Sequence, residues 1–129
     1  MKITLIFVLL LSFIVRLNAE PLEEMEYVLR FGFIKGGKAT LIAENEKINK
    51  KQAIHYRMRG RTTGIVDKIY EVNDVYESWV DPETYLPVKS VRNVKEQKYR
   101  FYDEVTYDHI NDSLFSLKSG RKKVPGKVN

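Results

Sequence analysis

The chain has 129 residues and no cysteine, so its length fits one domain at most. The absence of cysteine excludes disulfides, thiolate metal sites, cysteine nucleophiles and a lipidated cysteine behind a leader. Lysine and arginine number 22 against 17 acidic residues, and part of that surplus lies in the C-terminal tail. This modest charge, without a basic face or a known motif, argues against nucleic-acid binding.

Residues 1–19 have the pattern of a secretory signal peptide. Lys2 precedes an apolar run from Ile3 to Val15, and Ala19 offers a small residue for cleavage before Glu20. The apolar run is shorter than the ~20 residues that a membrane-spanning helix needs, which favours cleavage over an uncleaved membrane-anchoring helix. We therefore expect export to the periplasm or cell envelope, with no membrane span after cleavage and with 20 basic against 17 acidic residues remaining.

The first part of the mature chain predicts a hairpin. From Met25 to Lys35 the apolar residues recur at every second position, which is typical of a strand with one buried side. Gly36-Gly37 follows at once, and two glycines suit a tight turn because positive φ costs them nothing. We expect the return strand from Lys38 to Glu44, and a solvated loop over the lysine-rich residues 45–52.

The next strand is expected from Ala53 to Arg59, with alternating apolar and basic residues. His55, Arg57 and Arg59 share one face, which could hold an anionic group. The favoured interpretation is a solvent-facing edge strand whose charges discourage aggregation. Beyond it, Thr63 could cap a short helix in which Ile65, Val66, Ile69 and Tyr70 line one side, although a continuous strand from Ile65 to Val75 competes.

The stretch from Val75 to His109 predicts three antiparallel strands, and we expect the rest of the chain to be organised around it. Asp81–Thr84 has turn residues, since proline presets φ and an aspartate can accept hydrogen bonds from the amides ahead of it. A weaker turn is expected at Lys95–Gln97. Pro87 cannot donate to a ladder, so we expect it at a strand start or a sheet edge. One face of the third strand carries Tyr99, Phe101, Val105 and Tyr107.

A turn at His109–Asp112 and a last short strand at Ser113–Ser119 complete the expected elements. The predicted fold class is mainly β: a curved antiparallel meander sheet, half-barrel or β-roll like, with at most one short helix besides the N-terminal signal helix. The expected organisation is a signal peptide over 1–19, an antiparallel β domain over 20–120 and a basic frayed tail over 121–129.

Several separated segments carry a resemblance to a known family. They are R-F-G-F-I-K-G-G-K-A-T-L after Tyr27, Y-E-V-N-D-V-Y-E-S-W-V-D, L-P-V-K-S-V-R-N-V-K-E-Q-K-Y-R-F-Y-D and S-L-K-S-G-R-K-K-V-P. In order, they resemble the bacterial exported family known as domain of unknown function 3108. The resemblance implies a signal-bearing envelope protein built mostly of antiparallel strands, and it implies no reaction and no catalytic residues.

Members of that family usually continue beyond the V-P that is Val124-Pro125 here. The resemblance therefore leads us to expect a chain truncated at its C-terminus. An open sheet edge and an incompletely covered apolar face would then follow, which is an aggregation hazard.

The sequence contains no recognisable catalytic motif. There is no G-x-S-x-G, and the only histidines are His55 and His109, which have no metal-ligand spacing around them. Asp103 and Glu104 are adjacent and point to opposite faces, which argues against a paired carboxylate site. We therefore expect no catalytic residue, no metal site and no cofactor.

The preferred functional hypothesis is a non-enzymatic envelope protein whose curved sheet presents an apolar concave face to a lipid, a glycan or another envelope protein. It rests on the aromatic residues of the strands: Tyr27, Phe31, Phe33, Tyr56, Tyr76, Trp79, Tyr99, Phe101 and Tyr107. The candidate ligand-binding residues are Trp79, Tyr76, His55, Arg57 and Arg59. Trp79 could equally cap the core at the end of the sheet.

Two alternatives stay open. One is an enzyme acting on envelope polysaccharide or lipid, with His55, Arg57 and Arg59 and an acid such as Glu77 or Asp103 as participants. The other is a fragment without a function of its own.

Overall fold

The computed structural model describes residues 22–124. The expected signal peptide over 1–19 and the last five residues of the expected tail lie outside the described residues. Within 22–124, no helix has both the length and the apolar composition that a membrane crossing requires.

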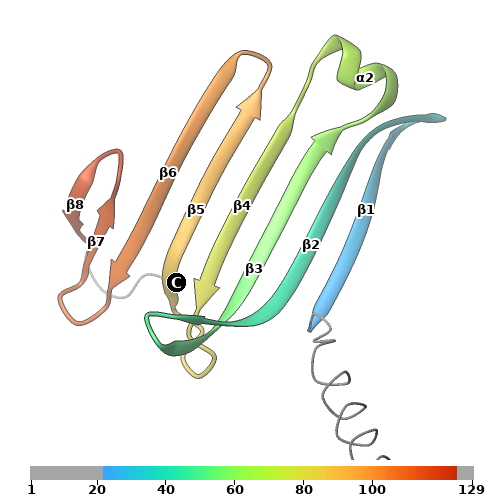
Figure 1. Cartoon of the computed structure of the whole chain (residues 1–129). Helices are drawn as coiled ribbons and strands as arrows, with labels where there is room; N and C mark the ends of the chain where they lie inside the picture. Colours follow the sequence, from blue (N-terminus) through green and yellow to red (C-terminus); the bar gives the residue numbers. More distant parts are fainter. Residues whose placement is uncertain (1–21, 125–129) are drawn as a thin grey trace, which may run out of the picture.

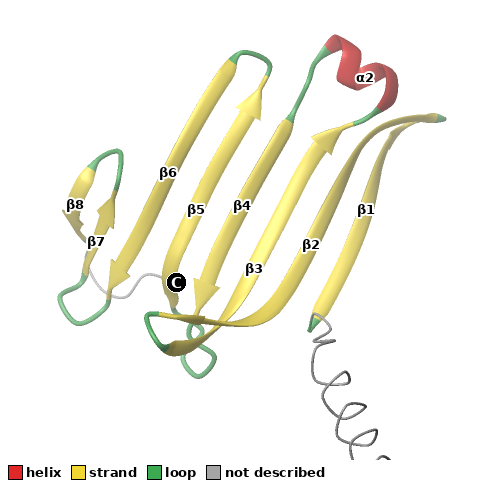
Figure 2. Ribbon diagram, viewed as in Figure 1, coloured by secondary structure: helices red, strands yellow, loops and turns green. Residues whose placement is uncertain are grey.

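The described residues form one eight-stranded antiparallel sheet in which each strand pairs with the next along the chain (Figure 1). The strands are β1 (Glu23–Phe31), β2 (Ile34–Ile48), β3 (Lys51–Thr62), β4 (Asn73–Val80), β5 (Pro87–Glu96), β6 (Tyr99–Asp108), β7 (Ser113–Ser116) and β8 (Gly120–Lys123). The sheet is open, with β1 and β8 at its edges. One short helix, α2 (Gly64–Ile69), connects β3 to β4 (Figure 2). The predicted fold class, a mainly β antiparallel meander with one short helix, is confirmed.

The first hairpin turns four residues earlier than predicted. β1 ends at Phe31, and the turn is formed by Gly32 and Phe33, with Gly32 at φ +64°. Gly36 and Gly37 lie inside β2 and are buried. Gly37 is needed there for close approach, because a Cβ would lie 3.0 Å from the Arg61 carbonyl oxygen on β3. The prediction failed because a glycine can serve a turn or a crowded strand, and the pattern alone does not separate the two uses.

The lysine-rich residues 45–52 are not a loop. β2 runs on to Ile48, β3 begins at Lys51, and only Asn49 and Lys50 form the turn. Both turn residues have positive φ, at 50° and 65°, as a type I′ hairpin requires. The polar composition reflects exposure of this hairpin on both faces, which hides its extended conformation from a hydrophobic pattern.

The predicted helix after Thr63 is confirmed, but the predicted cap is not. The Thr63 side chain makes no capping hydrogen bond, and no residue of α2 is buried. Ile65 is 62% exposed and Ile69 is 73% exposed. The helix is held mainly by the backbone, where the Thr63 amide donates to the Gly36 carbonyl oxygen at 3.2 Å and the Tyr70 amide to the Val66 carbonyl oxygen at 2.8 Å.

The first expected turn of the central meander lies where it was predicted, at Asp81–Thr84, whereas the second lies later than predicted, at Gln97–Lys98, because Lys95 and Glu96 still belong to β5. Asp81 Oδ1 accepts the amides of Glu83 at 2.8 Å and Thr84 at 3.0 Å. These bonds, that of Thr84 foremost, hold the pKa of Asp81 below its ordinary value. Pro87 begins β5, as expected of a residue that cannot donate to the ladder.

The C-terminal segment differs from the prediction in two respects. The expected last strand at Ser113–Ser119 is shorter, ending at Ser116, and Gly120–Lys123 forms β8 beside it where a frayed end was expected. Gly120 has φ +78°, which allows the chain to reverse into this strand.

The sheet is a single layer with a small core. The buried apolar residues of the described part are Ala43, Ala53, Val91 and Val94, and no large side chain between 22 and 124 is fully buried. Both faces therefore stay largely in contact with solvent, and strand pairing contributes much of the order. The two faces differ in chemistry, because strand side chains alternate between them.

We call one face the aromatic face, defined by Tyr27, Tyr56, Tyr76, Phe101 and Tyr107, which the strand register places on the same side. The other is the hollow face, which contains the cavity described next.

Candidate functional site

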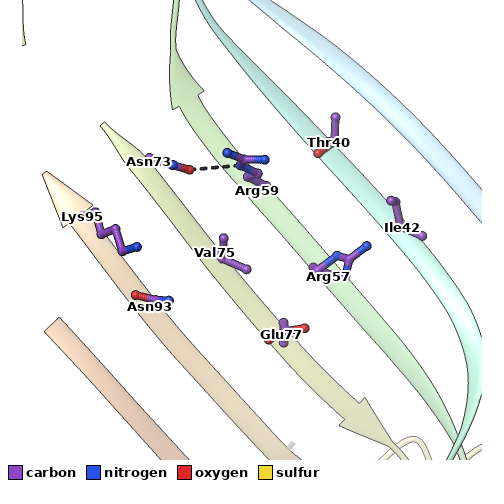
Figure 3. Close-up of a pocket in the computed structure, with 9 residues that line it drawn as sticks. All are labelled: Thr40, Ile42, Arg57, Arg59, Asn73, Val75, Glu77, Asn93 and Lys95. Carbon is purple, nitrogen blue, oxygen red and sulfur yellow. Dashed lines mark hydrogen bonds between the residues drawn. The ribbon is translucent and has the colours of Figure 1, made fainter. Parts of the chain in front are cut away.

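A hollow of about 640 Å³ lies on the hollow face, across the four adjacent strands β2 to β5 (Figure 3). The register explains which side chains meet there. Arg59 pairs with Thr40 on β2 and with Val75 on β4, and Val75 pairs with Asn93 on β5. The lining consists of Thr40, Ile42, Arg57, Arg59, Asn73, Val75, Glu77, Asn93 and Lys95. All of these side chains are brought together by period-two alternation on neighbouring strands.

The hollow is positively charged. It contains Arg57, Arg59 and Lys95, against one carboxylate, Glu77. Arg59 Nε donates to Asn73 Oδ1 at 3.0 Å (Figure 3), which fixes the side chain while its terminal nitrogens face the hollow's solvent. Among residues 22–124, neither Arg57 nor Lys95 forms an ion pair with a carboxylate. Three basic side chains, one of them positioned by a hydrogen bond, and a positive balance suit an anionic ligand.

Glu77 is already engaged beside the hollow. Its Oε1 lies 3.0 Å from His55 Nε2, and the other ring nitrogen, Nδ1, lies 2.7 Å from Glu46 Oε2. Both imidazole nitrogens of His55 therefore lie within hydrogen-bonding distance of a carboxylate oxygen. Glu77 Oε1 is thus engaged by His55, and among residues 22–124 Glu77 forms no ion pair with its cross-strand neighbour Arg57.

His55 is the only histidine of the described residues that is buried, at 8% exposure. Its ring stacks on Trp79, with centroids 4.3 Å apart and planes 2° from parallel. Burial of a polar ring is tolerated here because both nitrogens have partners and the indole covers one face. His55 and Trp79 therefore form a stacked pair beside the hollow, on the same face.

A second ionic contact lies next to this stacked pair and joins β5 to β6. Lys89 Nζ lies 2.7 Å from Glu104 Oε1 and 5.3 Å from the Trp79 ring centroid. The hydrogen bond from Lys89 holds the pKa of Glu104 below its ordinary value. Desolvation, followed by the neighbouring Glu104, raises the pKa of Tyr102. Lys89 is therefore paired with a carboxylate, whereas, within the described part of the chain, Arg57 and Lys95 of the hollow are not.

The structure divides the five residues predicted from the sequence. Arg57 and Arg59 line the hollow, and His55 and Trp79 lie beside it on the same face. Tyr76 points to the aromatic face, where the Arg92 guanidinium lies 6.0 Å from its ring centroid. The expected aromatic-rich face is formed, but most strand aromatics lie on the face opposite to the polar hollow, so Tyr76 is separated from Arg57 and Arg59.

The expected edge position of His55, Arg57 and Arg59 is wrong. β3 pairs with β2 on one side and with β4 on the other, so it is an interior strand. Its basic residues cannot serve to protect an edge from aggregation, which was the favoured interpretation. They lie instead between β2 and β4, whose side chains on the same face include Thr40, Asn73 and Glu77.

Sequence reasoning did not single out Thr40, Asn73, Asn93 and Lys95. Each stands one strand away from an arginine or from another lining residue, so no local motif marks it. These residues could have been predicted from the alternation of side chains along the strands. Once the strand pairing is fixed, every second residue on β2, β4 and β5 falls on the face of Arg57 and Arg59.

The contacts of His55 restrict what this side chain can do chemically. His55 has carboxylate partners at both nitrogens, which leaves neither free to act as a base. Between residues 22 and 124, no cluster of three histidine or acidic side chains is placed to hold a metal ion. Guanidinium forks beside amides and a hydroxyl can bind a phosphate or carboxylate that is flanked by hydroxyl groups.

Comparisons with known proteins give a family but no precedent for the site. No curated protein matches the chain, and no solved structure does. The family model described as "Protein of unknown function (DUF3108)" matches residues 26–128, which covers most of the chain and all of the hollow. The chain therefore belongs to the DUF3108 family of proteins of unknown function.

Proposed function

We propose that this protein is a non-enzymatic binding module of the cell envelope that holds an anionic group in the hollow. The group is a phosphate or carboxylate carried by a glycan or by a lipid headgroup. The observation that carries the proposal is the pair Arg57 and Arg59 on an interior strand, with Lys95 and without ion-pair partners for Arg57 and Lys95 among residues 22–124. The envelope location is inferred from the signal-like residues 1–19.

The composition of the hollow supports a hydroxyl-bearing anion. Asn73 and Asn93 each provide an amide that can donate and accept, and Thr40 adds a hydroxyl. Ile42 and Val75 give a small apolar floor, which suits the carbon skeleton of a sugar or glycerol unit. A simple apolar ligand would leave three cations without partners, so the hollow does not favour an acyl chain.

The hollow is open and its cations are exposed, so we expect weak affinity for a small probe. A charge-assisted hydrogen bond contributes roughly 1.5–3 kcal/mol. Losing one arginine should therefore weaken binding by about ten- to a hundredfold. Salt should weaken it as well, because the site is screened by mobile ions.

The experiment measures the dissociation constants of two soluble probes at constant ionic strength. Glucose 1-phosphate represents a glycan source, and short-chain phosphatidylglycerol below its micelle concentration represents a lipid source. The variants are Arg57→Gln, Arg59→Gln and, as a matched control, Lys47→Gln. Lys47 is equally an exposed strand cation, but it lies on the aromatic side of β2.

We expect saturable binding that is weakened at least about tenfold in Arg57→Gln and Arg59→Gln and changed less than about twofold in Lys47→Gln. Preference between the two probes identifies the source of the anion. An equal loss in all three variants would show unspecific attraction to a basic protein, and no saturation with either probe would also refute the proposal.

A further inference from the structure

Exposed apolar side chains gather at one end of the sheet. We call this end the α2 rim and define it by the β1–β2 turn, α2 with its flanks, and the β5–β6 turn, which lie along the same end in Figure 1. Its exposed apolar residues are Phe33 (93%), Ile34 (43%), Ile65 (62%), Ile69 (73%), Tyr70 (50%) and Tyr99 (58%). These six belong to three segments that are far apart in the chain.

Contacts between the three segments make the rim one structure. The Thr63 amide donates to the Gly36 carbonyl oxygen at 3.2 Å, which ties α2 to β2. Gln97 ties the β5–β6 turn to the helix, because its amide donates to the Glu71 carbonyl oxygen at 2.7 Å and its Nε2 to the Ile69 carbonyl oxygen at 2.9 Å. These hydrogen bonds connect the three segments that carry the exposed apolar side chains.

The opposite end of the sheet differs in both apolarity and charge. Its turns, over residues 47–52, 81–86 and 108–112, expose only Tyr85 and Ile110 among the large apolar residues. Those three segments contain three basic and four acidic residues. The corresponding rim segments, over 30–35, 61–71 and 96–100, contain six basic and three acidic residues. Apolar tips and positive charge therefore coincide at one end only.

We propose that the α2 rim docks on an anionic lipid surface, with Phe33, Ile65 and Ile69 entering the interfacial layer and Lys35, Lys68 and Lys98 near the headgroups. The inference is independent of the hollow and goes beyond the binding function proposed for it.

The shape of the rim favours a lipid surface over a protein partner. A stable protein interface buries about 800 Å² on each side, with matched packing. The rim consists of tips from two separate turns and from a helix in which no residue is buried. A fluid layer fills the spaces between such tips, and flanking lysine and arginine are attracted to its negative charge.

The absence of cysteine gives a direct test, because one introduced cysteine can be labelled without ambiguity. Phe33→Cys and, as the matched control, Ile110→Cys are each labelled with an environment-sensitive dye. Both positions are 93% exposed, in turns at opposite ends of the sheet, so neither substitution removes a buried contact. The local readout separates the rim from any binding by the apolar residues 1–19.

The labelled chains are mixed with vesicles of phosphatidylcholine alone or with phosphatidylglycerol added. We expect a blue shift and an emission rise at position 33 with the anionic vesicles, a smaller change with neutral ones, and none at position 110. With the dye attached at Ile69→Cys instead, Phe33→Ser should lower the affinity for anionic vesicles about tenfold, because one large apolar side chain no longer inserts. Lys68→Glu should lower it further at low salt.

Several outcomes would overturn the proposal. They are equal dye responses at positions 33 and 110, no response at position 33, or an affinity for anionic vesicles that is unchanged in Phe33→Ser. Vesicle binding that is lost in Arg57→Gln while the dye at position 33 stays in water would place the lipid headgroup in the hollow. That outcome would refute the rim proposal and support the proposed function, so the two can fail separately.

Discussion

Replacing His55 with alanine should lower the free energy of unfolding more than replacing His109, the other histidine, with alanine. His55 is 8% exposed, contacts two carboxylates and stacks on Trp79 at 4.3 Å. The bond to Glu77, whose side chain is 22% exposed, contributes about 1.5–3 kcal/mol. The contact to Glu46, which is 46% exposed, contributes at most about 1 kcal/mol because solvent screens it.

The stack on Trp79 adds about 0.5–1.5 kcal/mol. These contributions overlap, and together they place the loss of unfolding free energy at about 2–4 kcal/mol. His55→Phe keeps the stack and removes both polar contacts, so it should fall between alanine and the native residue. His109 is the matched control. It is half-buried, and one ring nitrogen lies 2.7 Å from the Pro87 carbonyl oxygen, so His109→Ala should cost about 1 kcal/mol.

The assay is urea unfolding followed by the fluorescence of Trp79, the only tryptophan, and by far-ultraviolet circular dichroism in parallel. Dichroism is needed because the substitution changes the immediate surroundings of the fluorophore. A loss below about 1 kcal/mol for His55→Ala, or a loss equal to that of His109→Ala, would refute the reasoning.

Two further predictions concern acid stability and the first turn. Asp103 accepts hydrogen bonds from the Ser116 hydroxyl at 2.7 Å and the Lys118 amide at 3.0 Å, and the Ser116 bond foremost holds its pKa below the ordinary value. Its contribution to stability is therefore complete above the unfolded-state pKa near 3.8 and is lost as the pH falls through the lower folded-state pKa. Urea midpoints measured from pH 6 to pH 2 should show that Asp103→Asn flattens this acid limb, and an unchanged limb would argue against the assignment. Gly32 has φ +64° whereas Gly60 has an ordinary strand φ and open space at its Cβ position. Gly32→Ala should cost about 1 kcal/mol and Gly60→Ala should be neutral or stabilising by up to about 1 kcal/mol, as thermal unfolding can show; the reverse order would contradict the observed turn.

The sequence predicts the fold class well because alternation is strong where a strand has an apolar side. Tyr99, Phe101, Val105 and Tyr107 reveal β6 in this way, and Asp81-Pro82 reveals its turn from local chemistry alone. The β2–β3 hairpin could not be predicted in this way. Its strands are exposed and polar on both sides near the turn, so alternation carries no hydrophobic signal there.

The candidate site is predictable only in part, for a reason of register. Arg57 and Arg59 were recognised because they alternate on one strand, whereas Asn93 and Lys95 join them from two strands away. Tyr76 was assigned to the same site although its parity, once β3 and β4 are paired, puts it on the other face. Shifting one strand by a single residue would exchange the faces, so pairing must be known before a site can be assembled.

The claim that the hollow face holds an anion can be tested most directly by mapping amide chemical shifts during a titration with inorganic phosphate. Sodium chloride at matched ionic strength is the reference. We predict saturable shifts on β2 to β5 at the residues around the hollow, with Arg57, Asn73 and Asn93 among the largest. Shifts spread over all basic residues, or centred on the tail beyond β8, would contradict the account.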